Sequence, residues 1–152
     1  MKRRLCILSI EDNDGDRFMI ERFFDPLLHR FELFFVGDGC EAMDFLGKTG
    51  QDSQTPKPHA ILLDLNLQKK DGREVLEEIK KAPQFKDIPV FVLTTSRADE
   101  DRQRCLSLGA ERFFSKPASI QTFNDVLDEI RKWIENRYST PEDNTNLISF
   151  VT

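Results

Sequence analysis

The 152-residue chain is 39% hydrophobic and 32% charged, a composition that fits one globular domain with a hydrophobic core. Its net charge of −5 and its lack of a polybasic stretch disfavour nucleic-acid binding. No apolar run is long enough to cross a membrane and no signal-peptide pattern is present, so the sequence predicts a cytoplasmic protein with no membrane attachment.

The first third of the chain gives two strand patterns, each followed by a helical pattern. A short apolar run predicts a strand over Leu5–Ile10. A helical pattern starts at residues 14–15, and Pro26 is expected to kink or end this helix because proline fits poorly in a helix interior. A second strand is predicted over residues 31–36, with a second helix after it. Residues 47–59 are rich in glycine, proline and polar residues, which predicts a surface loop.

The same alternation occurs three more times before the chain ends. The predicted segments are a strand at Ala60–Leu63, a helix at Arg73–Lys81, a strand at Ile88–Thr94, a helix at Asp99–Leu108, a strand at Glu111–Ser115 and a last helix after Ser119. The run Ala60–Leu63 is apolar throughout, which is typical of a strand buried on both faces of a parallel sheet. Five strands alternating with five helices predict an α/β fold with a doubly wound parallel sheet.

The cysteines and histidines exclude two common kinds of site. Cys6, Cys40 and Cys105 are widely spaced and odd in number, which fits reduced thiols better than a disulfide framework or a metal site. His29 and His59 do not lie beside a cluster of cysteines or serines. The sequence therefore disfavours a zinc enzyme and a hydrolase with a catalytic triad.

Polar residues follow four of the predicted strands at the point where each strand ends. They are Glu11 with Asp12, Asp64, Thr94, and Lys116 with Pro117. Because a parallel sheet brings the carboxyl ends of its strands to one edge, we expect these residues to share one shallow site. Three carboxylates that lie close together repel one another unless a cation binds. Mg²⁺ prefers oxygen ligands and keeps several waters, so the pattern predicts a magnesium site with room for a phosphoryl group.

This ordered set of residues resembles the response-regulator receiver domains of two-component signalling. The motifs that carry the resemblance are Glu11-Asp12-Asn13, Asp64-Leu65-Asn66, Asp71-Gly72, Thr94-Thr95-Ser96 and Lys116-Pro117. The resemblance covers residues 4–138 and is greatest to the small stand-alone regulators of cyanobacterial phytochromes. It implies a flavodoxin-like (βα)5 receiver fold with strand order 2-1-3-4-5 over residues 1–138, followed by a tail at residues 139–152.

The resemblance implies the phosphoacceptor and the metal ligands. Asp64 would be the phosphoacceptor, a carboxylate nucleophile that forms an acyl phosphate. Asp12, Asp64 and the backbone carbonyl of Asn66 would bind Mg²⁺ directly, and Glu11 would hold a metal-bound water.

The resemblance also implies the residues of a phosphorylation switch. Lys116 would pair with Asp64 and then with a phosphoryl oxygen, and the Lys116–Pro117 peptide bond is expected to be cis. Thr94 would donate its hydroxyl to the phosphoryl group, and Phe113 stands at the position of the family's switch aromatic. A departure from the family pattern is the residue at position 68, a glutamine where many relatives have proline, and it leaves the lifetime of the phosphoryl group open.

We therefore predict a single-domain response regulator that is not an enzyme and that signals through contacts of the receiver itself. It would take its phosphoryl group from a sensor histidine kinase, of the phytochrome type by the resemblance. One alternative is a receiver-like binding module that takes no phosphate, which the intact set of Asp12, Asp64, Thr94 and Lys116 disfavours. Another is a magnesium-dependent phosphatase with an aspartyl nucleophile, which Asn66 disfavours because that class usually has a second acid at this position.

Two surfaces are predicted to bind proteins. The first helix places Met19 and Phe23, and with them Phe18, away from its buried stripe, beside the acidic site, where a kinase could dock. The alternative is that Phe23 packs under the turn near Pro26. The tail turns apolar at residues 147–151, and free apolar residues at a terminus are an aggregation liability. Together with the resemblance to regulators that tend to be dimers, the tail predicts a homodimer.

Overall fold

The computed structural model describes residues 3–50 and 54–139, and five parallel strands form its central sheet. The strands are β1 (Leu5–Ile10), β2 (Phe31–Val36), β3 (Ala60–Leu63), β4 (Val90–Thr94) and β5 (Arg112–Ser115). Their order across the sheet is β2-β1-β3-β4-β5, and each neighbouring pair is parallel. The predicted doubly wound α/β fold and its strand order are therefore confirmed.

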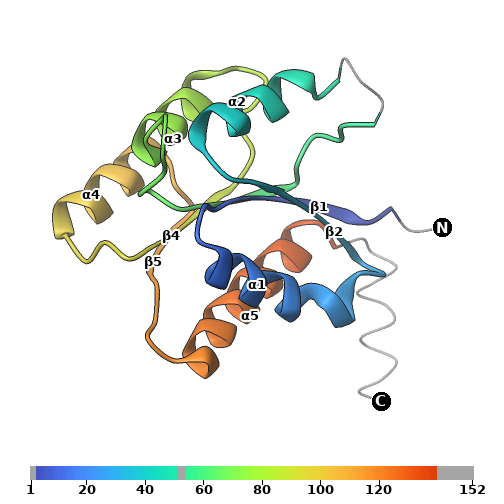
Figure 1. The fold of residues 1–152 in the computed structure, drawn as a ribbon. Helices are drawn as coiled ribbons and strands as arrows, with labels where there is room; N and C mark the ends of the chain where they lie inside the picture. Colours follow the sequence, from blue (N-terminus) through green and yellow to red (C-terminus); the bar gives the residue numbers. More distant parts are fainter. Residues whose placement is uncertain (1–2, 51–53, 140–152) are drawn as a thin grey trace.

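Five helices cover the two faces of the sheet (Figure 1). They are α1 (Asp14–Phe24), α2 (Gly39–Lys48), α3 (Gly72–Lys81), α4 (Asp99–Leu108) and α5 (Ile120–Arg137). Helices α1 and α5 lie together on one face, and α2, α3 and α4 cover the other. None of these helices is both long and apolar enough to pass through a bilayer, within the described ranges.

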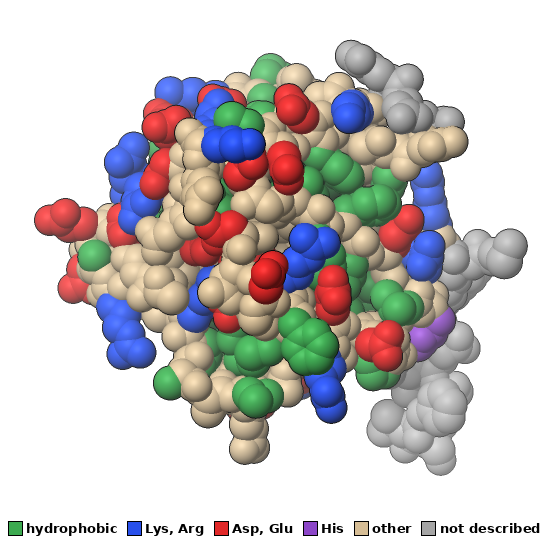
Figure 2. All heavy atoms as spheres, viewed as in Figure 1, with side chains coloured by type: hydrophobic (Ala, Val, Ile, Leu, Met, Phe, Trp, Pro, Cys, Tyr) green, Lys and Arg blue, Asp and Glu red, His purple; other side chains and the backbone are tan. Residues whose placement is uncertain are grey.

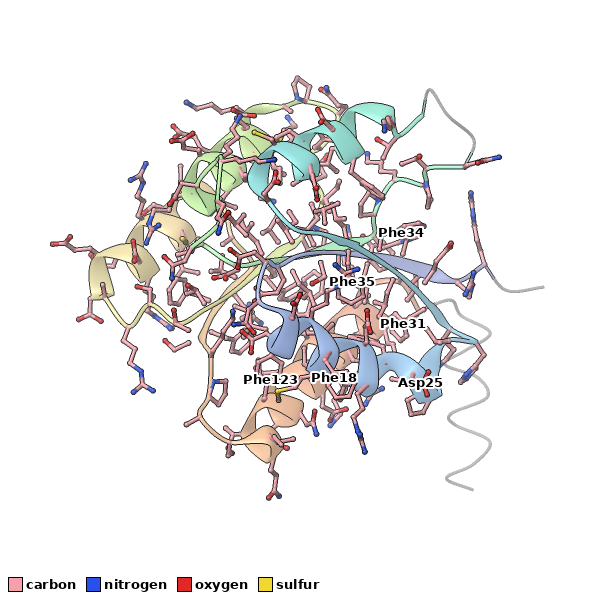
Figure 3. All side chains as sticks on the ribbon, in the orientation of Figure 1. Phe18, Asp25, Phe31, Phe34, Phe35 and Phe123 are labelled. Carbon is pink, nitrogen blue, oxygen red and sulfur yellow. The ribbon has the colours of Figure 1, made fainter. Side chains whose placement is uncertain are left out.

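Alternating side chains along each strand divide the core into two layers. In β2, Phe34 faces α2 and packs on Phe45 at 5.3 Å between ring centroids, whereas Phe35 faces α1 and lies under the guanidinium of Arg17 (Figure 3). All four residues of β3 are buried, as its uninterrupted apolar run predicts. Each fully buried Leu, Ile or Phe contributes about 1.5–3 kcal/mol to stability, so these two layers hold the sheet in place.

Helix α1 ends where the proline predicts. The α-helix stops at Phe24, and Pro26 lies in a short 3₁₀ helix, η1 (Asp25–Leu27), where its missing N–H costs nothing. Phe24 is fully buried and packs edge-on against Phe31 at the start of β2. The proline therefore turns the chain from α1 into β2.

Two glycines let the loops at the carboxyl edge of the sheet pack closely. A Cβ on Gly72 would overlap the carbonyl oxygen of Asp64, and a Cβ on Gly39 would overlap the carbonyl of Lys70. Asp71 caps α3 by accepting the backbone N–H of Arg73 at 2.8 Å. The Asp71-Gly72 pair thus starts α3 directly against the end of β3.

The remaining differences from prediction are small. Strand β4 begins at Val90 rather than Ile88, since Pro89 has no N–H to give to the ladder. All three cysteines are free, as the sequence predicts; Cys6 and Cys105 are buried, and Cys40 is exposed.

Candidate functional site

The backbone of the sheet fixes the predicted site residues at one edge. Beyond β3, the N–H of Asp64 donates to the carbonyl of Ile10 at 3.1 Å. Beyond β5, the N–H of Lys116 donates to the carbonyl of Thr94 at 2.6 Å. Glu11 directly follows β1. The carboxyl ends of four strands therefore meet, as expected for a parallel sheet.

Three carboxylates form the centre of this edge. Glu11, Asp12 and Asp64 each offer an oxygen atom, and these oxygens lie within 4.8 Å of one another. Glu11 is 4% and Asp64 6% exposed, whereas Asp12 is open to solvent. Such a set is costly without a cation, and its oxygen-only ligands with one solvent-facing side fit Mg²⁺, which keeps waters in its coordination shell.

The Lys116 ammonium is surrounded by carboxylates. Its Nζ donates to Oδ2 of Asp16 at 2.7 Å, to Oε1 of Glu11 at 2.8 Å and to Oδ2 of Asp64 at 3.3 Å. The lysine side chain is only 7% exposed. We name these four residues the Lys116 cluster. Asp16 comes from the first turn of α1 and was not among the residues that the sequence predicts for the site.

The charges of the Lys116 cluster do not balance. Burial raises the pKa of Glu11 to about 8; the hydrogen bond from Lys116 opposes this shift, and the charges of Asp64 and Asp16 add to it. Burial disfavours the charged form of Lys116, but its hydrogen bonds to Asp16 and Glu11 outweigh this and hold its pKa above the usual value. A charged ammonium therefore faces more carboxylates than it can neutralise.

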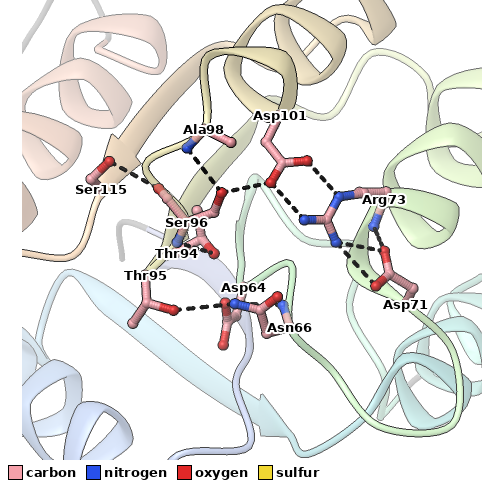
Figure 4. Close-up of polar contacts among 10 residues, drawn as sticks. All are labelled: Asp64, Asn66, Asp71, Arg73, Thr94, Thr95, Ser96, Ala98, Asp101 and Ser115. Carbon is pink, nitrogen blue, oxygen red and sulfur yellow. Dashed lines mark hydrogen bonds and ion pairs between the residues drawn. The ribbon is translucent and has the colours of Figure 1, made fainter.

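The hydroxyl residues lie beside Asp64, at the end of β4. Thr94 is fully buried, and its Oγ1 accepts the N–H of Ser96 at 3.3 Å. The side-chain amide of Asn66 donates to Oγ1 of Thr95 at 3.1 Å, and its backbone N–H donates to Oδ1 of Asp64 at 3.3 Å (Figure 4). The loops after β3 and β4 are thereby joined across the site.

A second charged cluster, which the sequence did not predict, links these loops to two helices (Figure 4). Arg73 binds Asp101 through two parallel hydrogen bonds, from Nε and Nη2, each of 2.7 Å. The Nη1 of Arg73 also donates to both oxygens of Asp71 at 3.1 Å. Ser96 Oγ donates to Asp101 at 2.6 Å. We name these four residues the Arg73 network.

The Arg73 network joins the start of α3 to the start of α4. The hydrogen bonds from Arg73 and then from Ser96 lower the pKa of Asp101 to about 2. The hydrogen bonds of Arg73 to Asp101 and to Asp71 outweigh the effect of burial and raise the pKa of Arg73. Both side chains are about one-fifth exposed, so water competes only in part with the pair.

Two expectations about the site and its surroundings are corrected. No peptide bond in residues 3–50 and 54–139 is cis, so the Lys116–Pro117 bond is trans, the lower-energy isomer of most bonds to proline. On α1, Phe23 is half-buried and packs edge-on against Phe24 at 5.0 Å, so it is not a free surface residue. Phe18 is the exposed aromatic, at 59% (Figure 3).

Phe113 lies in the core rather than at the surface. It is 7% exposed and belongs to the buried cluster on the face that α2, α3 and α4 cover. The backbone carbonyl of Phe113 accepts a hydrogen bond from Arg102 of α4 at 3.4 Å. Any rearrangement of this side chain would therefore alter the contact between β5 and α4.

A family model and several known proteins match this chain in sequence. Residues 7–128 match the family model described as "Response regulator receiver domain". The chain is 38% identical over 130 residues to response regulator Rcp1 of Synechocystis sp., covering 85% of this chain and 88% of Rcp1.

Two solved structures extend the likeness. The Mn²⁺-bound form of Rcp1 superposes with a TM-score of 0.79 at 38% identity, covering 86% of this chain and 95% of Rcp1. The phosphorylated cyanobacterial phytochrome response regulator RcpA superposes with a TM-score of 0.83 at 35% identity, covering 91% of this chain and 99% of RcpA. The flavodoxin-like fold is thus shared with one protein solved in an Mn²⁺-bound form and with another solved in a phosphorylated form.

Proposed function

Because this chain belongs to the response regulator receiver domain family, we propose that it accepts a phosphoryl group on Asp64 in a Mg²⁺-dependent reaction. The observation that carries the proposal is the position of Asp64. Its carboxylate is buried at the sheet edge, within 4.8 Å of two further carboxylates and 3.3 Å from the Lys116 ammonium. Asp64 acts here as the acceptor of a signal rather than as the nucleophile of an enzyme with a separate substrate.

The chemistry follows from the residues around Asp64. A carboxylate oxygen of Asp64 attacks phosphorus, the bond from phosphorus to the donor breaks, and an acyl phosphate remains. The ammonium of Lys116 pairs with a phosphoryl oxygen, and the Thr94 hydroxyl donates a hydrogen bond to the group. Asp12, Asp64 and the backbone carbonyl of Asn66 would hold Mg²⁺, with Glu11 acting through a water. When bound, the ion neutralises charge on the phosphoryl oxygens.

We propose that the donor is a phosphohistidine of a sensor histidine kinase, of the phytochrome type. The likeness to Rcp1 and RcpA supports this choice. Hydrophobic side chains reach the surface over α1 and α5 (Figure 2), and Phe18 and Ile120 are 59% and 69% exposed there. This apolar area next to the acidic edge suits a helix of the kinase.

The output of phosphorylation would be a shift between two conformations. Thr94 would move toward the phosphoryl group, and the buried position that Phe113 already occupies would gain population over an outward one. The surface that responds would be α4, β5 and α5, since Phe113 lies on β5 and contacts Arg102 of α4.

We also propose that the chain forms a homodimer through α4, β5 and α5. Leu106 of α4 and Ile120 of α5 are exposed apolar residues on these elements. The tail, predicted to take part, lies outside the described residues. Light scattering on the full chain and on a form that ends at Tyr138 would test both statements. A monomeric full chain at micromolar concentration would rule out the dimer. A truncated form that is still dimeric would show that the tail is not needed for dimerisation.

The phosphoacceptor role is tested with acetyl phosphate, Mg²⁺ and intact-mass measurement. The wild type is expected to gain one phosphoryl group, and the Asp64→Asn variant none. Removing Mg²⁺ with EDTA should abolish the gain in the wild type. If the wild type gained no mass, the alternative of a phosphate-independent binding module would be favoured. Steady turnover of small phosphate esters would favour a phosphatase instead.

A further inference from the structure

The shortest contact of the Lys116 ammonium is not with the proposed phosphoacceptor. Its Nζ lies 2.7 Å from Asp16 and 2.8 Å from Glu11, but 3.3 Å from Asp64. A charge-assisted N–H···O bond is usually about 2.7–2.9 Å long, so the contact with Asp64 is the weak one of the three. The ammonium is therefore drawn toward α1 and away from Asp64.

Asp16 is held where it can make this contact. It lies in the first turn of α1, and its backbone N–H donates to the N-cap side chain of Asn13 at 2.9 Å. Its carboxylate accepts a hydrogen bond from the ammonium of Lys116, which lies 100 residues later in the sequence. The cap fixes the turn, and the turn brings the carboxylate to the site edge.

The two strong acceptors of the ammonium differ in how easily they can release it. Glu11 is 4% exposed, so losing its hydrogen bond would leave a buried carboxylate unpaired. The Asp16 side chain is 24% exposed, so water can replace the ammonium there. Asp16 is thus the partner that can give up Lys116 at low cost.

We propose that Asp16 is a positioning residue that holds the Lys116 ammonium away from Asp64 and thereby weakens binding of a phosphoryl group at Asp64. This inference rests on the proposed function, because it concerns the lysine that would pair with the phosphoryl oxygen. A phosphoryl oxygen competes with Asp16 for the same ammonium. Asp16 consequently sets how strongly the chain favours its unphosphorylated form.

The test measures the affinity for beryllofluoride, a phosphoryl mimic, in saturating Mg²⁺ by calorimetry. Asp16→Asn should bind it about fivefold more tightly than the wild type, because a partly exposed ion pair of about 1 kcal/mol no longer competes. Asp16→Glu keeps the charge and can still reach Lys116, so it should stay close to the wild type. Asp14→Asn removes the same charge from an exposed site in the same helical turn and should also leave the affinity unchanged.

Three outcomes would overturn the inference. An unchanged affinity in Asp16→Asn would mean that Asp16 does not compete, and a lowered affinity would mean that it anchors the ammonium for phosphoryl binding. An equal gain in Asp14→Asn would assign the effect to net charge. Failure of the wild type itself to bind beryllofluoride would instead refute the proposed function, so the two failures are distinct. A folding defect in Asp16→Asn cannot imitate any of these results, since fewer binding-competent molecules lower the measured stoichiometry rather than change the affinity of the folded fraction.

Discussion

The carboxyl edge of the sheet carries two charged clusters that are built differently. In the Arg73 network one guanidinium meets two carboxylates, and its planar donors match Asp101 in a parallel pair of 2.7 Å bonds. In the Lys116 cluster one ammonium meets three carboxylates, with a fourth, Asp12, close to two of them. The first arrangement satisfies its donors with well-aligned bonds, whereas the second leaves an excess of negative charge.

This difference distinguishes an ion network that stabilises the fold from a site whose charge changes when it binds an ion. The Arg73 network joins the first turns of α3 and α4 through hydrogen bonds that are already formed. In the Lys116 cluster the carboxylates repel one another, and this repulsion is relieved only when the cluster binds a cation or a proton. Removing the guanidinium from the first cluster should therefore lower stability, whereas removing a carboxylate charge beside the second should raise it.

The largest expected effect is on the Arg73 network. Arg73→Ala should lower the free energy of unfolding by about 2 kcal/mol, because hydrogen bonds between charged partners are lost and Asp101 is left without its guanidinium. Urea unfolding followed by circular dichroism measures this loss. Arg104→Ala is the matched control, since its side chain is 57% exposed and lies 4.0 Å from Glu77, and it should cost much less. Equal losses in the two variants would refute a structural role for the Arg73 network.

The second prediction has the opposite sign. Asp12→Asn should raise the stability of the metal-free protein by about 1 kcal/mol, because it removes repulsion with Glu11 and Asp64 without breaking a contact to Lys116. Mg²⁺ should raise the melting temperature of the wild type and have little effect on this variant. A destabilised Asp12→Asn protein in EDTA would show that the trio is not under repulsion.

Much of the fold and part of the site could be predicted from the sequence because their signals are local. Apolar runs mark the strands, and Pro26 and Gly109 mark helix ends within a residue or two of the observed bounds. Glu11 and Asp64 could be found because each directly follows a predicted strand. The parallel sheet then brings them together without any knowledge of side-chain packing.

The parts that could not be predicted depend on contacts between distant segments. Asp16 follows no strand, and it reaches the site only because α1 packs beside the loop after β5, 100 residues away. The pairing of Arg73 with Asp101 likewise needs the relative placement of two helices. Phe23 was expected at the surface because helical spacing alone does not show that its ring packs on Phe24.

The third prediction separates the two clusters by pH. The folded-state pKa of Glu11 is raised from 4.5 to about 8, so the folded protein holds this proton more tightly than the unfolded chain. Its contribution to stability is therefore full below about pH 4.5 and is lost as the pH rises through 8. Asp101 has a pKa lowered from 3.8 to about 2, so its contribution is full above about pH 4 and is lost as the pH falls through 2.

Melting temperatures in EDTA from pH 2 to pH 9 would test this contrast. Glu11→Gln should remove the part of the pH dependence between pH 5 and 8, while His59, whose pKa burial lowers, titrates in both proteins. Arg73→Ala should instead weaken the fall in stability below pH 4. If Glu11→Gln kept the pH profile of the wild type, Glu11 would not be the group that titrates in the upper range.

The smallest expected effect concerns Ser96, which connects the Arg73 network to Thr94 at the end of β4. Its N–H donates to Oγ1 of Thr94, and its Oγ donates to Asp101 and accepts the N–H of Ala98. Ser96→Ala removes the two contacts made by the hydroxyl but keeps the backbone contact with Thr94. It should lower stability by about 0.5–1 kcal/mol, since Asp101 keeps both bonds from Arg73.

The same variant shows whether the Arg73 network follows events at Asp64. In the wild type, beryllofluoride with Mg²⁺ should shift the amide resonances of Thr94 and, through Ser96, that of Asp101. In Ser96→Ala the shift at Thr94 should persist and the shift at Asp101 should shrink, because the hydroxyl that joins the loop to α4 is absent. Ser107→Ala removes the hydroxyl of a serine on α4 outside the network and should leave both shifts unchanged. Undiminished shifts at Asp101 in Ser96→Ala would mean that α4 senses the site by another route, such as the contact between Arg102 and the backbone of Phe113.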